Sequence, residues 1–300
     1  MNSKTTFEPL SNCDGKRILI FGCGYLGKEI GRHLVKHGKE VWGTTRRREN
    51  FAKIRDNGIN PILSDWNDPR TLQELDPFTH IVISVSRGRD TKKSHWDSLV
   101  LGLQNLLPRL ARAKHFVYIS STGVYHQKDG GWVDENSPAF PTRPSARAHL
   151  AAENLLRRHC TTQSWNVLRL AGIYGPQRVP NRQQLLNGSP LQVDPNSFLN
   201  LIHVEDAAQA AILALEKSDQ STYLISDDRP VRRGDYYSFI AKHLKAAKPT
   251  YANRGKSVPS GARSEGNKRV WNRKMKKQLL QNLKHPTFED GLPSLLRSGH

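Results

Sequence analysis

Arg17-Ile-Leu-Ile-Phe-Gly-Cys-Gly-Tyr-Leu-Gly27 joins an apolar segment to three closely spaced glycines. The apolar segment, Ile18–Phe21, predicts a β-strand that is buried on both faces. After the glycines, apolar side chains recur at helical spacing from Leu26 to Val35, and Gly38 is a suitable residue to end a helix. The stretch therefore predicts a strand, a tight turn and a helix in direct succession.

Each glycine in the spacing G-x-G-x-x-G has a separate physical role. Gly22 permits a tight turn, Gly24 removes a Cβ that would keep a phosphate away, and Gly27 lets the helix pack closely on the strand. The helix N-terminus adds free N–H groups and a partial positive charge. The setting predicts a dinucleotide-binding fingerprint, and the alternative is a glycine-rich turn that binds nothing. The predicted cofactor-binding residues here are Gly22, Gly24, Tyr25, Leu26 and Gly27.

The composition describes a basic chain of 300 residues with a formal net charge of +19. No stretch reaches the ~18 consecutive apolar residues of a membrane span. The polar N-terminus, Met1–Asp14, lacks the features of a signal or transit peptide. Three cysteines without C-x-x-C spacing fit a reducing compartment and offer no zinc site. We therefore expect a cytoplasmic protein with no membrane partner and no bound metal.

Positive charge is concentrated in the C-terminal quarter. Residues 229–300 contain 17 Lys+Arg and 4 Asp+Glu, a net of +13, which leaves +6 for residues 1–228. Such charge marks either a nucleic-acid footprint or a basic surface around a site for anionic ligands. The basic residues are dispersed, few aromatic residues lie among them, and no nucleic-acid module is recognisable. We favour the second interpretation and expect no nucleic-acid partner.

Strand and helix patterns alternate through the first half of the chain. The alternation predicts βαβ crossovers and an α/β fold of the Rossmann type, with a doubly wound parallel sheet. We expect an NAD(P)-binding domain over residues 15–175. Residues 176–300 are expected to form a smaller α/β substrate-binding portion interleaved with that sheet. The main predicted elements are the strands His80–Val85, His115–Ser120 and Trp165–Leu170 and the helices Ser94–Ala113 and Ser145–Cys160.

The second predicted strand is followed by arginines and no acid, in Val41-Trp-Gly-Thr-Thr-Arg-Arg-Arg48. An NAD site places Asp or Glu at this point, where it accepts from the ribose 2′-hydroxyl. Thr45, Arg46 and Arg47 suit the 2′-phosphate of NADP through charge-assisted hydrogen bonds. A solvated basic helix start is the other interpretation. We expect NADP(H) as the preferred cofactor, with NAD(H) as the alternative.

Four further segments complete a pattern that resembles a known family. They are Tyr118-Ile-Ser-Ser-Thr-Gly-Val-Tyr125, Arg169-Leu-Ala-Gly-Ile-Tyr-Gly-Pro176, Asn200-Leu-Ile-His-Val-Glu-Asp-Ala-Ala208 and Lys268-Arg-Val-Trp-Asn272. With the glycine motif they span most of the chain. The whole resembles the short-chain dehydrogenase/reductase superfamily, in its extended NAD-dependent epimerase/dehydratase branch.

The resemblance implies further cofactor contacts. Asp65 resembles the residue that accepts a hydrogen bond from the adenine amino group. Trp66 packs either on that ring or against the protein. Ser84 and Val85 end the fourth predicted strand, where the family's backbone passes the ribose and the nicotinamide. Relatives often pair through the helices corresponding to Ser94–Ala113 and Ser145–Cys160, so a monomer or a homodimer is expected.

The catalytic residues that the resemblance implies are only partly present. Ser121 matches the family's Ser, four residues before Tyr125. When the chain is aligned on Pro144 and Glu153, however, Ser145 stands at the Tyr position and His149 at the Lys position. A free Tyr has a pKa of ~10 and is a poor base at neutral pH without a cationic neighbour. The chain therefore resembles atypical members that lack the Tyr-x-x-x-Lys pair. The catalytic candidates are Ser121, His149 and Tyr125.

Two classes of function fit this pattern. The first is an NADP-dependent oxidoreductase, or epimerase-like enzyme, for a small anionic substrate such as a nucleotide sugar. The second is a non-catalytic NADP(H)-binding sensor or scaffold protein, which the missing pair favours directly. We favour the first, because the chain keeps the family's Ser as Ser121 and is basic overall. Fold alone does not decide between them.

Overall fold

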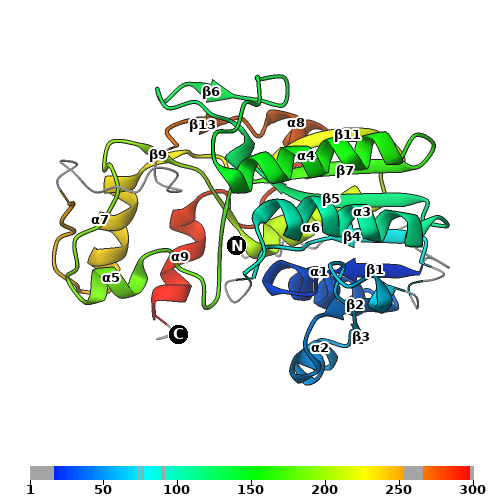
Figure 1. Ribbon diagram of the computed structural model, residues 1–300. Coiled ribbons are helices and arrows are strands. Elements are labelled where there is room, and N and C mark those ends of the chain that lie inside the picture. Colours follow the sequence, from blue (N-terminus) through cyan, green and yellow to red (C-terminus); the bar gives the residue numbers. More distant parts are fainter. Residues whose placement is uncertain (1–16, 73–74, 76–77, 89–91, 253–265, 298–300) are drawn as a thin grey trace. The chain divides into compact units, whose positions relative to one another are not determined.

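A computed structural model describes residues 17–72, 75, 78–88, 92–252 and 266–297 (Figure 1). The predicted domain start at residue 15 lies outside these ranges. The chain divides into two compact units, each assembled from separate stretches. Which unit binds cofactor and which binds substrate stays a prediction. The first unit holds the residues up to Ser121, Pro144–Arg169 and Ala208–Tyr223, and the second holds Thr122–Arg143, Leu170–Ala207 and the residues from Leu224 onward.

The first unit is built on a seven-stranded sheet in the order β11-β7-β5-β4-β1-β2-β3 (Figure 1). Central strand β1 (Ile18–Phe21) pairs in parallel with β2 (Val41–Thr45) and with β4 (His80–Ile83). The sequence of strands thus reverses direction across the sheet at β1, as in doubly wound folds. This confirms the predicted Rossmann-type α/β class. The other strands are β3 (Asn60–Leu63), β5 (His115–Ser121), β7 (Ser164–Leu170) and β11 (Gln220–Ile225).

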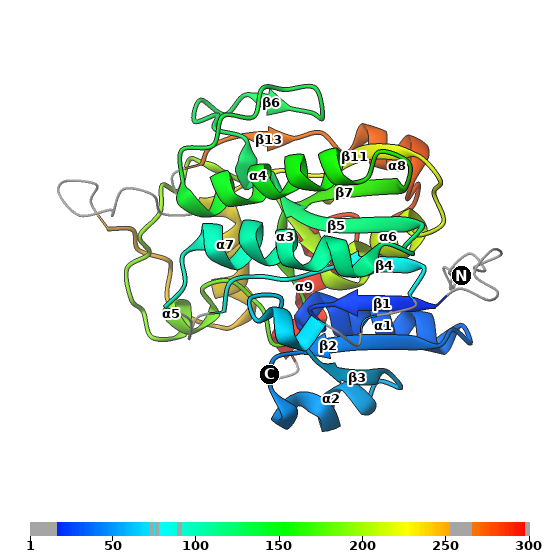
Figure 2. The same ribbon diagram turned by 45° about the vertical axis from the view of Figure 1, so that its right-hand side comes forward.

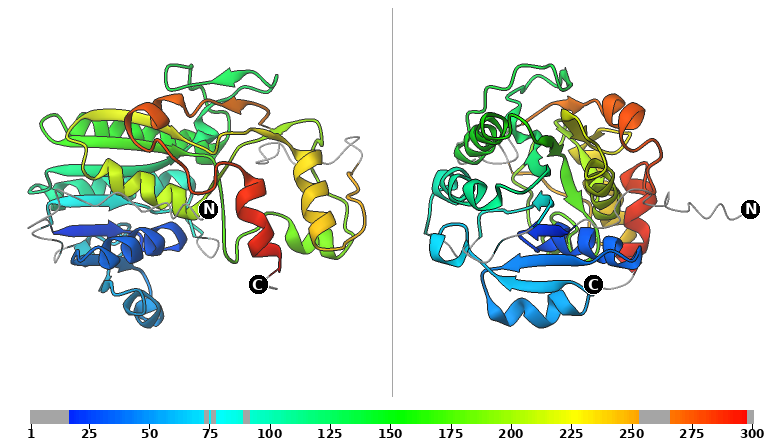
Figure 3. Two further views of the ribbon diagram at one scale, coloured as in Figure 1. Left: turned by 180° about the vertical axis from the view of Figure 1, so that it is seen from behind. Right: turned by 90° about the vertical axis from the view of Figure 1, so that its right-hand side faces the viewer.

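Helices cover both faces of this sheet, which is why β1 and β4 are buried along their whole length. Helices α3 (Gly102–Leu106) and α4 (Pro144–His159) lie on one face (Figure 2). Helix α1 (Tyr25–Lys36) and α6 (Val204–Ala214), most of which belongs to this unit, lie on the other (Figure 3). The short α2 (Phe51–Arg55) precedes β3.

Helix α1 begins and ends at glycines, as predicted. It follows the glycine turn directly and ends before Gly38, which has a φ of +74°. There the N–H of Gly38 bonds the Val35 carbonyl at 2.9 Å, and the N–H of Lys39 bonds the Leu34 carbonyl at 3.1 Å. This pair of bonds closes the last turn in the left-handed manner for which glycine is best suited.

The helix predicted over Ser94–Ala113 is less regular than its apolar spacing indicates. A π-helical turn (Asp97–Leu101) leads into α3, and a 3-10 turn (Leu107–Leu110) containing Pro108 ends it. Gly102 stands where the π turn changes to α-helix, and a Cβ there would lie 2.4 Å from Nε1 of Trp66. The indole is therefore packed directly against the helix backbone, a contact that periodicity does not reveal.

The second unit contains three pairs of short strands and its own apolar core. Tyr174, Tyr236, Phe288 and Leu292 are fully or almost fully buried in that core. No helix in the described part of the chain is long and apolar enough to cross a membrane. The strand pairs are β8 (Gly172–Tyr174) with β10 (Leu201–His203), β9 (Phe198–Leu199) with β12 (Val231–Arg232) and β6 (Trp132–Val133) with β13 (Arg269–Val270). Its other helices are α5 (Arg182–Leu186), α7 (Arg233–His243), α8 (Arg273–Gln278) and α9 (Phe288–Arg297).

We expect Gly102→Ala to lower the free energy of unfolding by roughly 1–3 kcal/mol, because it overpacks a rigid site. The Trp66 indole is 2% exposed and stacks on Phe21 at 5.6 Å between ring centroids, so it cannot move aside. Urea unfolding of purified variants measures the change. Gln104→Ala, at an exposed position of the same helix, is the control and should stay within about 0.5 kcal/mol of the parent. Equal stability of Gly102→Ala and the parent would contradict the packing argument.

Candidate functional site

The turn after β1 is fixed by contacts from two neighbouring strands. Gly22 has a φ of +92°, and its N–H donates to Oγ1 of Thr44 at 2.8 Å. A Cβ on Gly22 would lie 2.8 Å from both the Ser84 carbonyl oxygen and Cγ2 of Val85. The structure thus brings three predicted cofactor residues, Gly22, Ser84 and Val85, into contact at the carboxyl ends of β1 and β4. Sequence reasoning missed Thr44, whose side chain holds the turn.

The other two glycines of the fingerprint differ in what surrounds them. A Cβ on Gly27 would lie 2.6 Å from the Gly22 carbonyl oxygen, so close packing of the chain itself requires glycine there. A Cβ on Gly24 would meet nothing within 4 Å. Gly24 occupies the N-cap of α1, and the first turn of this helix, which includes Tyr25 and Leu26, carries no acidic residue. The open space therefore faces a helix N-terminus that suits a phosphate group.

The end of β2 presents a small polar turn. Oγ1 of Thr45 accepts from the Arg47 N–H at 3.3 Å and from the Asn50 side chain at 3.2 Å. The Arg46 and Arg47 side chains are exposed, and Arg47 pairs with the exposed Glu49 at 3.3 Å. The turn thus orders its backbone through Thr45 while both guanidinium groups stay on the surface.

Asp65 and Trp66, which follow β3, have different environments. Asp65 is half-buried, and its Oδ1 accepts from the Asn67 N–H at 2.9 Å. The Trp66 ring lies inside the hydrophobic core that includes Phe21 and Leu103. Of the two alternatives for Trp66, the structure shows packing against the protein. A contribution of Trp66 to cofactor binding stays a prediction.

The three catalytic candidates lie on separate elements. Ser121 is the last residue of β5, and His149 lies on α4; both are half-buried and belong to the first unit. Tyr125 belongs to the second unit and follows a 3-10 turn, Thr122–Val124. Its side chain is 3% exposed, and its backbone carbonyl accepts a hydrogen bond from Nζ of Lys268 at 3.3 Å. The catalytic roles of these residues stay predictions.

A buried ion-pair network includes Ser120, the residue before Ser121. The Glu153 carboxylate is fully buried and accepts from Oγ of Ser120 at 2.6 Å. Arg169 donates to it through Nη2 at 2.8 Å and through Nε at 3.1 Å, and Arg157 donates at 3.0 Å. This geometry ties α4 to β5 and β7. Sequence reasoning used Glu153 only to align the chain, although Ser120 and Arg169 lie in two of the segments that carry the resemblance.

The sequence pattern that defines the NAD dependent epimerase/dehydratase family matches residues 18–226. The chain belongs to this family. It therefore lies in the extended branch of the short-chain dehydrogenase/reductase superfamily, as the motifs and the sheet order indicate. Protein YeeZ of Escherichia coli K12 is 27% identical over 255 residues, which are 82% of this chain and 89% of YeeZ. A UDP-glucose 4-epimerase of Streptomyces lividans is 22% identical over 245 residues, 70% of this chain and 74% of that protein.

Two solved structures have the same architecture. A functionally unknown conserved protein from Silicibacter pomeroyi DSS superposes with a TM-score of 0.79 at 31% identity, over 95% of this chain and 99% of that one. The dTDP-glucose 4,6-dehydratase DesIV from Streptomyces venezuelae, with NAD and TYD bound, superposes with a TM-score of 0.80 at 21% identity, over 94% and 96%. At this identity the second likeness shows the fold alone.

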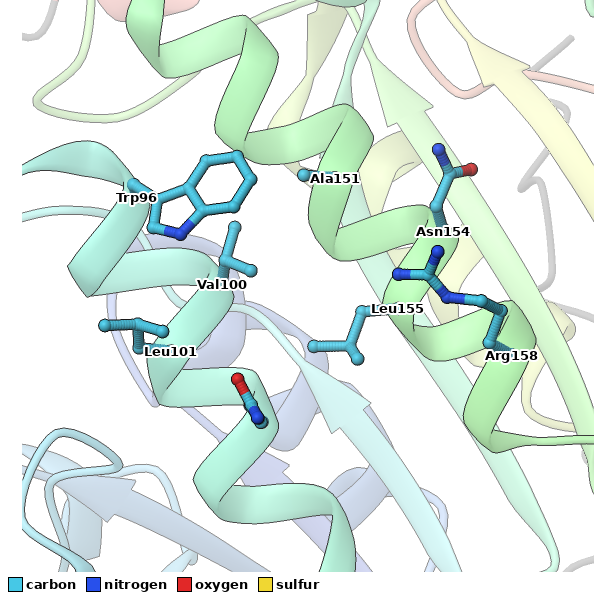
Figure 4. Close-up of a pocket in the computed structure, with 8 residues that line it drawn as sticks. Trp96, Val100, Leu101, Ala151, Asn154, Leu155 and Arg158 are labelled. Atoms are coloured by element: carbon cyan, nitrogen blue, oxygen red, sulfur yellow. The ribbon is translucent and has the colours of Figure 1, made fainter.

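A groove of about 450 Å³ lies between the helical run that contains α3 and helix α4 (Figure 4). Apolar side chains face it from both helices, and two of them, Trp96 and Leu101, are 49% and 43% exposed. None of the predicted cofactor or catalytic residues lines it, so it is separate from the candidate site. The monomer or homodimer expected from these helices stays a prediction. The lining residues are Trp96, Val100, Leu101, Gln104, Ala151, Asn154, Leu155 and Arg158.

In the second unit, the side-chain atoms of His203, Asp206 and His285 that could ligate a metal ion lie within 4.8 Å of one another. Asp206 accepts from the N–H groups of Lys284 and His285, at 2.7 and 3.0 Å. Nε2 of His285 contacts Glu205 at 2.8 Å. These bonds fasten the segment before α9 to the start of α6.

We expect Glu153→Ala to lower the free energy of unfolding by about 3–5 kcal/mol, because it leaves Arg169 charged and buried without its carboxylate. Urea unfolding measures the loss. Replacing both partners, as Glu153→Leu with Arg169→Met, should recover much of it, since no buried charge remains. Asn154→Ala, at an exposed position of α4, is the control. A double variant less stable than Glu153→Ala would show that the pair itself, and not the orphaned charge, dominates.

A second stability prediction concerns pH. The hydrogen bond from His285, opposed by burial and aided by Lys284, holds the pKa of Glu205 well below its usual range. A carboxyl with a lowered folded pKa stabilises the fold above its unfolded pKa, and the stabilisation disappears as pH falls through the folded pKa. Glu205→Gln should therefore be less stable than the parent at neutral pH, and the gap should narrow in acid. Urea unfolding across pH tests this, with the exposed Glu40→Gln as control; a gap independent of pH would contradict it.

Proposed function

We propose that the protein binds NADP(H) at the glycine turn of the first unit and acts as an NADP-dependent oxidoreductase. The observation that carries the proposal is the open space at Gly24. Gly22 and Gly27 are required by contacts within the chain, whereas nothing in the described protein explains a glycine at position 24. A pyrophosphate at the N-terminus of α1 supplies the reason, because it needs close approach to the backbone. When bound, NADPH supplies the hydride.

The preference for NADP rests on the end of β2. The turn from Thr45 to Arg48 offers three exposed guanidinium groups near the place where an NAD site has its acid. Arg47 pairs with Glu49, and we take Arg46 as the residue to test for contact with the 2′-phosphate. Guanidinium groups match phosphate oxygens through paired hydrogen bonds. Asp65 completes the proposed site as an acceptor for the adenine amino group.

For the catalytic step we propose that Ser121 hydrogen-bonds the substrate oxygen and that His149 exchanges the proton. Histidine is the side chain that most readily does so near neutral pH. The buried ring of Tyr125 makes it the weaker candidate for this role. The Streptomyces lividans relative of this chain is named UDP-glucose 4-epimerase. That name and the basic charge of the chain support a nucleotide-sugar-like anion as substrate. The replacement of the Tyr-x-x-x-Lys pair supports the second candidate, an NADP(H)-binding sensor without turnover.

Titration with NADPH, NADP⁺, NADH and NAD⁺, followed by cofactor fluorescence and calorimetry, tests the proposal. We expect Gly24→Ala to keep the melting temperature of the parent, because its Cβ meets no atom, and to weaken binding by roughly tenfold or more. Arg46→Ala should weaken NADP(H) binding selectively, whereas the exposed Arg48→Ala should not. Unchanged binding in Gly24→Ala, or no dinucleotide binding at millimolar concentration, would refute the site. Binding without turnover on any nucleotide sugar would favour the sensor.

A further inference from the structure

Two cationic side chains of the second unit are buried. Lys268 and Arg233 are each 8% exposed, although lysine and arginine almost always reach solvent unless they are paired. Their neighbours in sequence have a different environment. Arg232 and Arg269 lie over the ring of Phe198, with 5.2 and 5.0 Å between the guanidinium carbon and the ring centroid. In each pair of consecutive basic residues, 232–233 and 268–269, one side chain thus stacks on an aromatic ring and the other is buried.

The two buried cations are held on either side of one short segment. Arg233 donates through Nε to Oγ of Ser197 at 3.0 Å and through its backbone N–H to the Ser197 carbonyl at 2.9 Å. The next residue, Phe198, donates its N–H to Oδ1 of Asn267 at 2.9 Å. Asn267 directly precedes Lys268, so hydrogen bonds link the segments that carry the two cations. Arg233 and Lys268 are therefore neighbours in the fold of this unit.

Neither cation has a carboxylate partner in the part of the chain that the structure describes. The ion pairs of these residues involve other cations. Lys268 donates to the Tyr125 carbonyl at 3.3 Å, and Arg233 donates to a hydroxyl. Neutral acceptors satisfy hydrogen bonds but do not neutralise the charge, and buried charge without a counter-charge is costly.

The proton affinity of Lys268 reflects this environment. Burial, and then the charges of Arg143 and Arg233, lower the pKa of Lys268 from its ordinary value to about 8. Positive charge in a site with little access to water strengthens its attraction for an anion. Among the described residues, the arrangement is one that suits a bound anion as counter-charge.

We propose that Lys268 and Arg233 bind the anionic group of the substrate, a phosphate or a carboxylate. The inference rests on the proposed function only in assigning that anion to a substrate. Arginine and lysine together supply a planar fork and a point charge, which suit the oxygens of either group. Because Lys268 also bonds the backbone carbonyl of Tyr125, a bound anion would lie close to the segment that follows β5.

Calorimetry with sulfate and with acetate, on the full chain without dinucleotide, tests the proposal. Both ions remain fully charged at a pH of about 8, the pKa of Lys268. Lys268 is then about half deprotonated, and a bound anion should draw a proton onto it. We expect proton uptake, seen as a binding enthalpy that depends on the ionisation enthalpy of the buffer. Stronger binding of sulfate would indicate a phosphate ligand, and stronger binding of acetate a carboxylate ligand.

Variants separate this site from a general effect of charge. Lys268→Met and Arg233→Gln should each weaken anion binding by roughly tenfold or more. Lys268→Arg should bind the anion without proton uptake. Lys277→Met, at an exposed position of α8, removes the same charge elsewhere and should bind as the parent does. The anion should raise the melting temperature of the parent and of Lys277→Met, but not that of Lys268→Met.

The proposal is overturned if neither ion binds, or if Lys268→Met and Lys277→Met bind equally well. It is also overturned if Lys268→Met loses thermal stability while the anion leaves the parent's melting temperature unchanged; Lys268 would then serve only to hold the Tyr125 backbone. Gly24→Ala, which disables the proposed cofactor site, should still bind the anion with proton uptake. Failure of the cofactor proposal and failure of the anion site are therefore observed separately.

Discussion

The close approach of backbone to backbone at the glycine turn is the constraint on which the first unit depends. Because a Cβ on Gly27 would lie 2.6 Å from the Gly22 carbonyl, and one on Gly22 would lie 2.8 Å from the Ser84 carbonyl, helix and strand cannot meet in this way with larger residues. β1 stands in the centre of the sheet, so this turn fixes where α1 starts relative to the ends of β2 and β4. Gly24 is under no such constraint. Its lack of a side chain serves something other than packing, and a ligand phosphate is the simplest explanation.

Local patterns in the sequence predicted the sheet well, because its strands are short and apolar and because β1 and β4 are buried along their whole length. Contacts between distant residues could not be predicted in this way. The Trp66 indole lies against Gly102, Glu153 pairs with Arg169, and Lys268 reaches the Tyr125 carbonyl 143 positions away. Each contact depends on which side chains the folded chain brings together, which periodicity does not encode. The π turn before α3 was missed for the same reason, since apolar spacing is similar for a regular helix and for one with a single wide turn.

The two units differ in whether a buried cation has a carboxylate partner among the described residues. In the first, Arg169 forms an ion pair with the Glu153 carboxylate through two hydrogen bonds, so its charge is neutralised within the chain. In the second, Arg233 and Lys268 are equally inaccessible but meet only a hydroxyl and a carbonyl among the described residues. The sequence indicated a surplus of positive charge after residue 229 without showing its form. Part of that surplus is exposed, as at Lys277 of α8, and part is buried where it can act on a ligand.

The buried lysine of the second unit bears on the missing Tyr-x-x-x-Lys pair. In the family pattern, a lysine on the helix corresponding to α4 adjusts the proton affinity of a tyrosine, whereas this helix carries Ser145 and His149 at those positions. The chain nevertheless keeps a buried lysine, Lys268, whose pKa of about 8 allows proton exchange close to neutral pH. A bound anion would raise the pKa of this lysine again, since opposite charge favours the protonated state. Substrate binding and proton affinity would then be coupled through Lys268, a residue far in sequence from the glycine turn.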